Sequence, residues 1–187
     1  MTEWTWLGDH LALDFANTIR TDARGVEELI DTPQEFRGWL AAEPATLPEL
    51  EVTTSAITAL KALRDATVEL LAAAVREEPL PTQAVQVINE AVAAGAVRRL
   101  LTPSVRTTRH TAEADDPLAR MLGVLAASVV DLLGRDDLAN LARCPAPACG
   151  QFFHRSRPNM RWCSPGCGNR ARVDRHRHRA PGGASGP

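Results

Sequence analysis

The four cysteines of this 187-residue chain lie in two close pairs within one stretch of 24 residues. The first pair is Cys144 and Cys149, the second is Cys163 and Cys167, and 13 residues separate the pairs. Two close pairs with a short spacer are typical of a tetrahedral zinc site with four thiolate ligands. Four cysteines leave no position for water, so the pattern predicts one structural Zn²⁺ per chain rather than a catalytic ion.

Two disulfides and a redox pair are the alternatives to zinc. Disulfides are typical of secreted proteins, whereas the first residues lack the basic and apolar regions of a signal peptide. Neither pair has the Cys-x-x-Cys spacing of a thiol redox motif. His154 could replace one cysteine as a ligand, although a lone histidine near a zinc site is more often a neighbour.

Charge is divided unevenly along the chain. Residues 143–187 hold nine arginines and one acid, Asp174, for a net charge of +8, whereas residues 1–142 carry −10. Such asymmetry predicts a nucleic-acid-binding end, with a solvated basic tail as the alternative. Because no apolar run reaches about 18 residues and no signal peptide is visible, we expect a cytoplasmic protein that does not enter membranes.

Local signals predict how the cysteines are positioned. Ser164 and Pro165 are a good N-cap and first residue, so a helix should begin between the second two cysteines. Gly150 can take the positive φ that a knuckle at the first pair needs. We expect residues 151–154 and 161–162 to pair as a hairpin. Knuckle, hairpin and helix in this order form a treble-clef-like finger.

The helix of the finger is rich in arginine. At 100° per residue, Arg172, Arg175 and Arg179 share a face directed away from the zinc ligands. Asn169 lies beside this face, where its amide could reach a base edge or cap the fold. Arg170 lies nearer the metal and either contacts DNA or packs on the finger. These five residues are the candidate DNA-binding residues, and a solvated helix face is the alternative.

The rest of the chain predicts a mainly α fold with a small β component (α+β). Apolar periodicity, caps and proline positions indicate helices over about 10–19, 33–40, 54–76, 82–94 and 117–133 and a short helical connector at 136–141. Residues 97–111 predict one or two strands, with a hairpin as one arrangement. We therefore expect a helical domain over 1–140, a zinc finger over 141–179 and a disordered tail over 180–187.

Two stretches resemble a known bacterial family. Trp162-Cys163-Ser164, followed by Cys167-Gly168-Asn169-Arg170, is similar to the signature of the CGNR zinc finger. In that family the finger follows an ABATE domain, whose opening resembles residues 11–18 (LALDFANT) and whose next anchor resembles Trp39-Leu40. The resemblance implies a stress-related transcription regulator in which the four cysteines bind the metal.

The helical domain offers few groups for chemistry. Asp14 and Asn17 lie one turn apart and either face a ligand pocket or cap a neighbouring element. Trp39 either lines such a pocket or belongs to the core. The chain contains no GxGxxG, P-loop or HExxH motif, so we predict no enzyme.

The function that these features predict is binding of duplex DNA by the finger. The helical domain would sense a small-molecule effector or form a homodimer, because a second copy adds a second half-site contact. The alternative is an RNA- or protein-binding zinc module that does not act on operator DNA.

Overall fold

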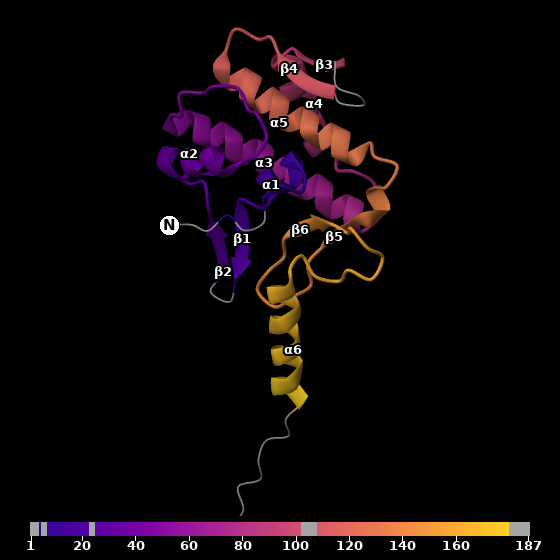
Figure 1. Ribbon diagram of the computed structural model, residues 1–187. Coiled ribbons are helices and arrows are strands. Elements are labelled where there is room, and N and C mark those ends of the chain that lie inside the picture. Colours follow the sequence, from indigo (N-terminus) through magenta and orange to yellow (C-terminus); the bar gives the residue numbers. More distant parts are fainter. Residues whose placement is uncertain (1–3, 5–6, 23–24, 102–107, 180–187) are drawn as a thin grey trace, which may run out of the picture.

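The computed structural model describes residues 4, 7–22, 25–101 and 108–179, and it is mostly helical with small two-stranded sheets, as expected (Figure 1). The helices are α1 (Leu11–Ala16), α2 (Pro33–Ala42), α3 (Thr54–Val75), α4 (Thr82–Ala94), α5 (Pro117–Leu133) and α6 (Pro165–Arg179), with a 3-10 turn, η1, at Leu138–Asn140. The strands are β1 (Ile19–Asp22), β2 (Gly25–Glu28), β3 (Val97–Leu101), β4 (Thr108–Ala112), β5 (Leu141–Arg143) and β6 (Phe152–His154). They pair antiparallel as β1–β2, β3–β4 and β5–β6.

The core lies where α1, α3 and α5 meet, and α2 and α4 cover it. Trp39 of α2 is fully buried, with its ring 5.4 Å from that of Phe36 and 5.8 Å from that of Phe15. The capping box of Thr32 and Glu35 is present and starts α2 so that this apolar face meets α1. Each large side chain buried in this way stabilises the fold by about 1.5–3 kcal/mol.

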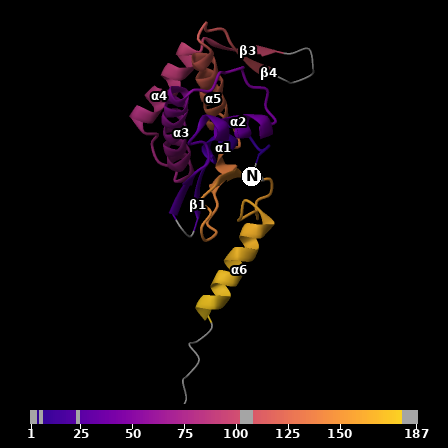
Figure 2. The same cartoon turned by 90° about the vertical axis from the view of Figure 1, so that its left-hand side faces the viewer.

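The core extends into the segment that follows the helices. Leu141 of β5 and Phe152 of β6 are 5% and 4% exposed and belong to the same apolar cluster as α3 and α5. A second, smaller cluster holds the cysteines together with Ala142, Ala146 and Phe153. The β5–β6 hairpin therefore has one side in the helical core and the other side in the cysteine cluster. From this hairpin, α6 projects away from the body, at the end opposite β3 and β4 (Figures 1 and 2).

One buried cation ties the β1–β2 hairpin to α3. Arg64 is 1% exposed, and its guanidinium donates hydrogen bonds to the carboxylates of Glu28 and Asp65. Burial alone would raise the pKa of Glu28, but the hydrogen bond and the charge of Arg64 outweigh it and hold that pKa below its usual value. The whole side chain of Arg64 is therefore buried, including its charged end.

Helix α1 is shorter than the sequence predicts. The helix expected over 10–19 ends at Ala16, and Ile19 begins a strand instead. Asn17 caps the helix, and the β-branched Thr18, Ile19 and Thr21 that follow favour the extended hairpin with β2. Residues 97–111, where the sequence predicts one or two strands, contribute to two strands, β3 and β4, which pair antiparallel, and the connector at 136–141 contains η1. Residues 180–187, expected to be disordered, lie outside the described residues.

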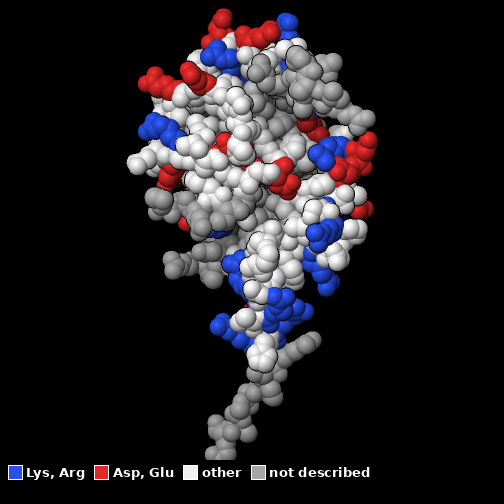
Figure 3. All heavy atoms as spheres, viewed as in Figure 1, with Lys and Arg blue, Asp and Glu red and all other residues white. Residues whose placement is uncertain are grey.

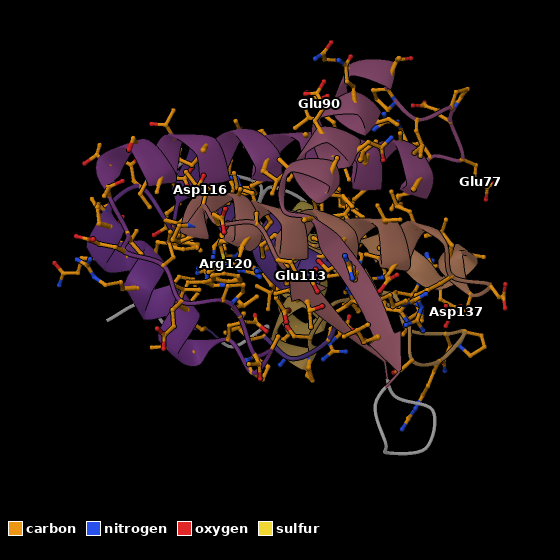
Figure 4. The ribbon with its side chains drawn as sticks, turned by 90° about the horizontal axis from the view of Figure 1, so that it is seen from above. Glu77, Glu90, Glu113, Asp116, Arg120 and Asp137 are labelled. Carbon is orange, nitrogen blue, oxygen red and sulfur yellow. The ribbon has the colours of Figure 1, made fainter. Side chains whose placement is uncertain are left out.

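Helices α4 and α5 cross at two glycines. A Cβ added to Gly95 would lie 2.8 Å from both the Ala119 carbonyl oxygen and the Gly123 Cα. Beyond this crossing, Arg120 donates hydrogen bonds to the carbonyls of Ala114 and Asp115 and fixes the loop that leads into α5 (Figure 4).

Gly95→Ala is expected to lower the free energy of unfolding by about 1–3 kcal/mol, because backbone atoms on both sides of the added methyl group must move. Gly38→Ala in α2 is the control, because nothing lies within 4 Å of its added Cβ. The control should gain up to about 1 kcal/mol from the higher helix propensity of alanine. Urea unfolding of both variants measures their free energies of unfolding. Equal changes in the two variants would contradict the close approach of α4 and α5 at Gly95.

Among the described residues, no helix combines the length and the apolar character that crossing a bilayer requires.

Candidate metal centre and nucleic-acid interface

The four cysteines converge, with their ligand atoms within 4.8 Å of one another. The sulfur of Cys163 lies 3.6 Å from that of Cys149 and 3.4 Å from that of Cys167. Tetrahedral thiolates at about 2.3 Å from Zn²⁺ are about 3.8 Å apart, whereas a disulfide needs about 2.05 Å. The cysteines thus form a single zinc site, as predicted, and small outward movements of the sulfurs accommodate the ion.

The first pair lies in a knuckle between β5 and β6. Ala148 and Gly150 have positive φ values of 55° and 67°, which turn the chain so that Cys149 faces Cys144. The Cys144 amide donates to the Gln151 carbonyl at 2.8 Å, and Arg143 Nε donates to the Gly150 carbonyl at 2.9 Å. The knuckle is therefore held by its own backbone and by one arginine.

The second pair is carried by the start of α6, as predicted. Pro165 is the first helical residue, and the amide of Cys167 donates to Ser164 Oγ at 3.2 Å. The predicted hairpin is wrong, because β6 pairs with β5 rather than with residues 161–162. That pairing places Leu141 and Phe152 in the helical core, which the local sequence does not reveal.

The CGNR motif has a structural explanation at each position. Cys167 is a ligand, and a Cβ at Gly168 would lie 3.1 Å from Trp162 Cδ1, so glycine lets the indole cover the helix start. Asn169 Oδ1 accepts a hydrogen bond from the Arg172 guanidinium. Arg170 Nη2 lies 3.1 Å from Cys167 Sγ and donates to it, which raises the pKa of Arg170. Because Zn²⁺ with four thiolates carries a net charge of −2, this guanidinium compensates the centre.

Hydrogen bonds between the thiols shift their pKa values in opposite directions. The hydrogen bond from Cys163 lowers the pKa of Cys149 to about 5 and raises the pKa of Cys163. Metal ligation requires deprotonated thiols, so the lowered pKa of Cys149 favours its ligation. His154 is not part of the cluster: its Nε2 lies 3.3 Å from Asp137 Oδ2, and its amide donates to Asp9 Oδ2 at 2.9 Å.

After Ala171, which is buried, α6 presents most of its described side chains to solvent. Arg172, Arg175 and Arg177 are exposed, and Val173 between them is 51% exposed. Arg179 is the last residue of α6, but its side chain lies outside the described residues. Figure 3 shows basic side chains gathered around α6 and acidic ones on the helical body. The chain thus presents a basic helix on the base that the four clustered cysteines form.

The three candidate ligand residues of the helical domain fall in different places. Asn17 joins the finger: its Nδ2 donates to the Phe152 carbonyl and its Oδ1 accepts from the Phe152 amide, both at 2.9 Å. Trp39 is fully buried in the core. Asp14 is 1% exposed and lines a surface pocket with Glu43, which sequence reasoning missed because Glu43 lies beyond the end of α2 and carries no local motif.

Asp14 predicts a pH dependence of stability. Burial raises its pKa to about 7, and the neighbouring Glu43 and Asp9 add to the effect. The folded protein therefore holds a proton more tightly than the unfolded chain, and stability is lost as pH rises from about 4 to about 7. Asp14→Asn removes this penalty, so its stability relative to the parent should rise over that range by at most about 4 kcal/mol. Urea unfolding at several pH values measures it, with exposed Asp136→Asn as control. Parallel curves for the parent and Asp14→Asn would contradict the assignment.

Comparison with known families places these features in context. Residues 9–136 match the ABATE family, described as "Putative stress-induced transcription regulator", and residues 140–180 match the CGNR zinc finger. Neither is a family of enzymes. A search of curated proteins finds no match. Because the first match covers most of the chain, the protein belongs to the ABATE family and carries a CGNR zinc finger after the ABATE domain.

Proposed function

We propose that this protein binds duplex DNA through α6 and that its helical domain controls the binding by sensing a small molecule or by forming a dimer. The observation that carries the proposal is the attachment of α6. Its first turn is held by Cys167 and Trp162, while the rest of the helix extends from the body with its arginines exposed. A helix of 15 residues is about 22 Å long and fits the major groove, which is about 12 Å wide.

Charge supports this orientation. The body carries most of the acids of the chain. Figure 4 views the body from the end opposite α6 and shows Glu90 on α4 and Glu113 and Asp116 before α5. α6 offers DNA a basic surface, whereas residues 1–142, which include the body, carry a net charge of −10. The protein would therefore meet DNA with α6 first.

Three arginines of α6 have different proposed roles in contacting DNA. Arg175 is exposed on α6 and suits a phosphate contact, and Arg179, four residues later in the sequence, is the second candidate for such a contact. Arg172 is held by Asn169 and so reaches DNA with its guanidinium already oriented. We assign Arg170 to the zinc site, where it contacts Cys167, rather than to DNA.

Arg172→Ala and Arg175→Ala are each expected to weaken binding to a short mixed-sequence duplex, because each removes one phosphate contact. Each should also reduce the slope of log affinity against log salt by roughly 1. Arg37→Ala, an exposed arginine on α2, is the matched control. Fluorescence anisotropy at several salt concentrations measures the affinities. If the α6 variants keep the parent slope, α6 is not the DNA-contacting surface.

RNA is the less favoured partner. Proteins that bind single strands stack bases on exposed aromatic rings. The aromatic residues of the finger serve its own packing: Phe152 and Phe153 are 4% and 6% exposed, and Trp162 covers Gly168. Competition between duplex DNA and single-stranded RNA of the same sequence distinguishes the two partners.

We place the division between sensing and DNA-binding parts near residue 140. The shared core of Leu141 and Phe152 means that the two parts are joined by packing rather than by a flexible linker. A change in the helical domain can then alter how α6 is held.

A further inference from the structure

Two buried carboxylates face one pocket with half of their oxygens unused. Asp14 Oδ2 accepts a hydrogen bond from the Gly8 amide at 2.8 Å, and Glu43 Oε1 accepts one from the Ala45 amide at 3.0 Å. The other oxygens, Asp14 Oδ1 and Glu43 Oε2, are buried without a hydrogen-bond partner. Asp14 and Glu43 are 1% and 8% exposed, and both line a pocket of about 270 Å³.

Unpaired buried oxygens of this kind lower the stability of the fold unless a hydrogen-bond donor reaches them. A buried acceptor without a partner destabilises a fold, and a buried charge does so more strongly. Here each carboxylate accepts a hydrogen bond from one loop amide and leaves its second oxygen unpaired beside the pocket that both residues line, so a small local movement lets a donor from outside reach the pair.

The surroundings define the chemistry of that donor. None of the described residues that line the pocket is Lys or Arg. His10 does not supply a cation, because burial lowers its pKa and its Nδ1 accepts a hydrogen bond from the Ala12 amide. Leu11 and Pro44 add apolar lining beside the acids. The pocket therefore suits a ligand whose cationic group carries several N–H donors and is attached to a short aliphatic chain.

We propose that this pocket binds a small organic cation bearing a primary ammonium or guanidinium group, held by Asp14 Oδ1 and Glu43 Oε2. A divalent metal fits less well, because the cysteines are the one group of three or more possible ligands found among the described residues. Ca²⁺ and Mg²⁺ take six or more oxygen ligands.

The pocket lies beside the contacts that hold the finger. Asp9 lines the pocket, and its Oδ2 accepts the hydrogen bond from the His154 amide of β6. Asn17, three residues after Asp14, binds Phe152 of the same strand. An occupied pocket would fix the segment from Gly8 to Asn17 and with it β6. This link between pocket and finger rests on the proposed sensing role. Binding of a cation in the pocket does not depend on that role.

Isothermal titration calorimetry of the full zinc-loaded chain tests the proposal, with putrescine, agmatine and ethanolamine as probes and 1,4-butanediol as an uncharged match for putrescine. At least one cation should bind with one-to-one stoichiometry, and butanediol should not. Above pH 7, where the Asp14 carboxyl is ionised, Asp14→Asn and Glu43→Gln should each weaken binding about tenfold or more, because each removes a charged acceptor. Exposed Glu49→Gln should bind as the parent does.

Several results would overturn the proposal: no binding by any of the three cations, equal binding of butanediol, unchanged binding in both pocket variants, or heat released by Mg²⁺ or Ca²⁺ alone. DNA affinity with and without the bound cation is measured separately. Binding in the pocket without a change in DNA affinity would leave the pocket site standing and remove the sensing link. If the α6 variants bind DNA as the parent does, the proposed function is contradicted, while the cation site in the pocket is unaffected.

Discussion

Cys167→Ala is expected to abolish zinc binding and unfold the finger while the helical body stays folded. Structural zinc supplies about 10 kcal/mol or more of apparent binding free energy in small fingers at neutral pH. Without it, the finger has only a small cluster of buried side chains, three of which are themselves ligands. Cys167 is 4% exposed and also accepts the hydrogen bond from Arg170, so its loss removes a ligand and leaves that guanidinium without its sulfur.

Two measurements separate the finger from the body. Zinc content should fall from about one equivalent per chain to nearly none, since three thiolates bind the ion less tightly than four. Hydrogen exchange should show loss of protection in α6 and the knuckle, with α3 and α5 unchanged, because those helices lie in the other cluster. The DNA binding proposed for α6 should be lost with them.

Ser164→Ala is the matched control for this experiment. It removes the oxygen that accepts from the Cys167 amide and costs α6 about 1 kcal/mol, but it leaves all four ligands in place. This variant should keep its zinc. A Cys167→Ala chain with a full equivalent of zinc and a protected α6 would show that the metal does not organise the finger.

The metal centre was predictable because its chemistry is local in the sequence. Each cysteine pair spans only a few residues, so spacing alone limits the geometry that the sulfurs can reach. The start of α6 was predictable for the same reason, since Ser164 and Pro165 directly precede it. The approximate ranges of α3, α4 and α5 follow from apolar periodicity and from proline and glycine at their ends.

Features that depend on distant contacts were not predictable. The partner of β6 was misassigned because residues 161–162 are near in sequence, whereas burial of Leu141 and Phe152 in the helical core selects β5. The early end of α1 and the β1–β2 hairpin were missed because Ile19 fits an apolar helical period as well as a strand. Asn17 and Phe152 are 135 residues apart, and no local pattern connects them.

Asn17→Ala is expected to lower the free energy of unfolding by about 2–5 kcal/mol. Asn17 is 3% exposed, and its amide satisfies both the amide and the carbonyl of Phe152. Alanine leaves these two buried backbone groups without partners, and each such group costs about 1–3 kcal/mol. The loss is large for a protein of this size, whose total stability is on the order of 5–15 kcal/mol.

Because these two bonds join α1 to β6, their loss should also separate the unfolding of the two parts. Far-UV circular dichroism, which is dominated by the helices of the body, reports the helical domain, and zinc release reports the finger. Urea transitions followed by the two signals should coincide in the parent and diverge in Asn17→Ala. Asn89→Ala, on the exposed face of α4, is the control and should shift stability by no more than about 0.5 kcal/mol. Asn17→Asp keeps an acceptor for the Phe152 amide but turns a second oxygen toward the Phe152 carbonyl, so it should restore little. If Asn17→Ala matches the control, or if Asn17→Asp behaves as the parent does, the paired hydrogen bonds are not what connects the helical domain to the finger.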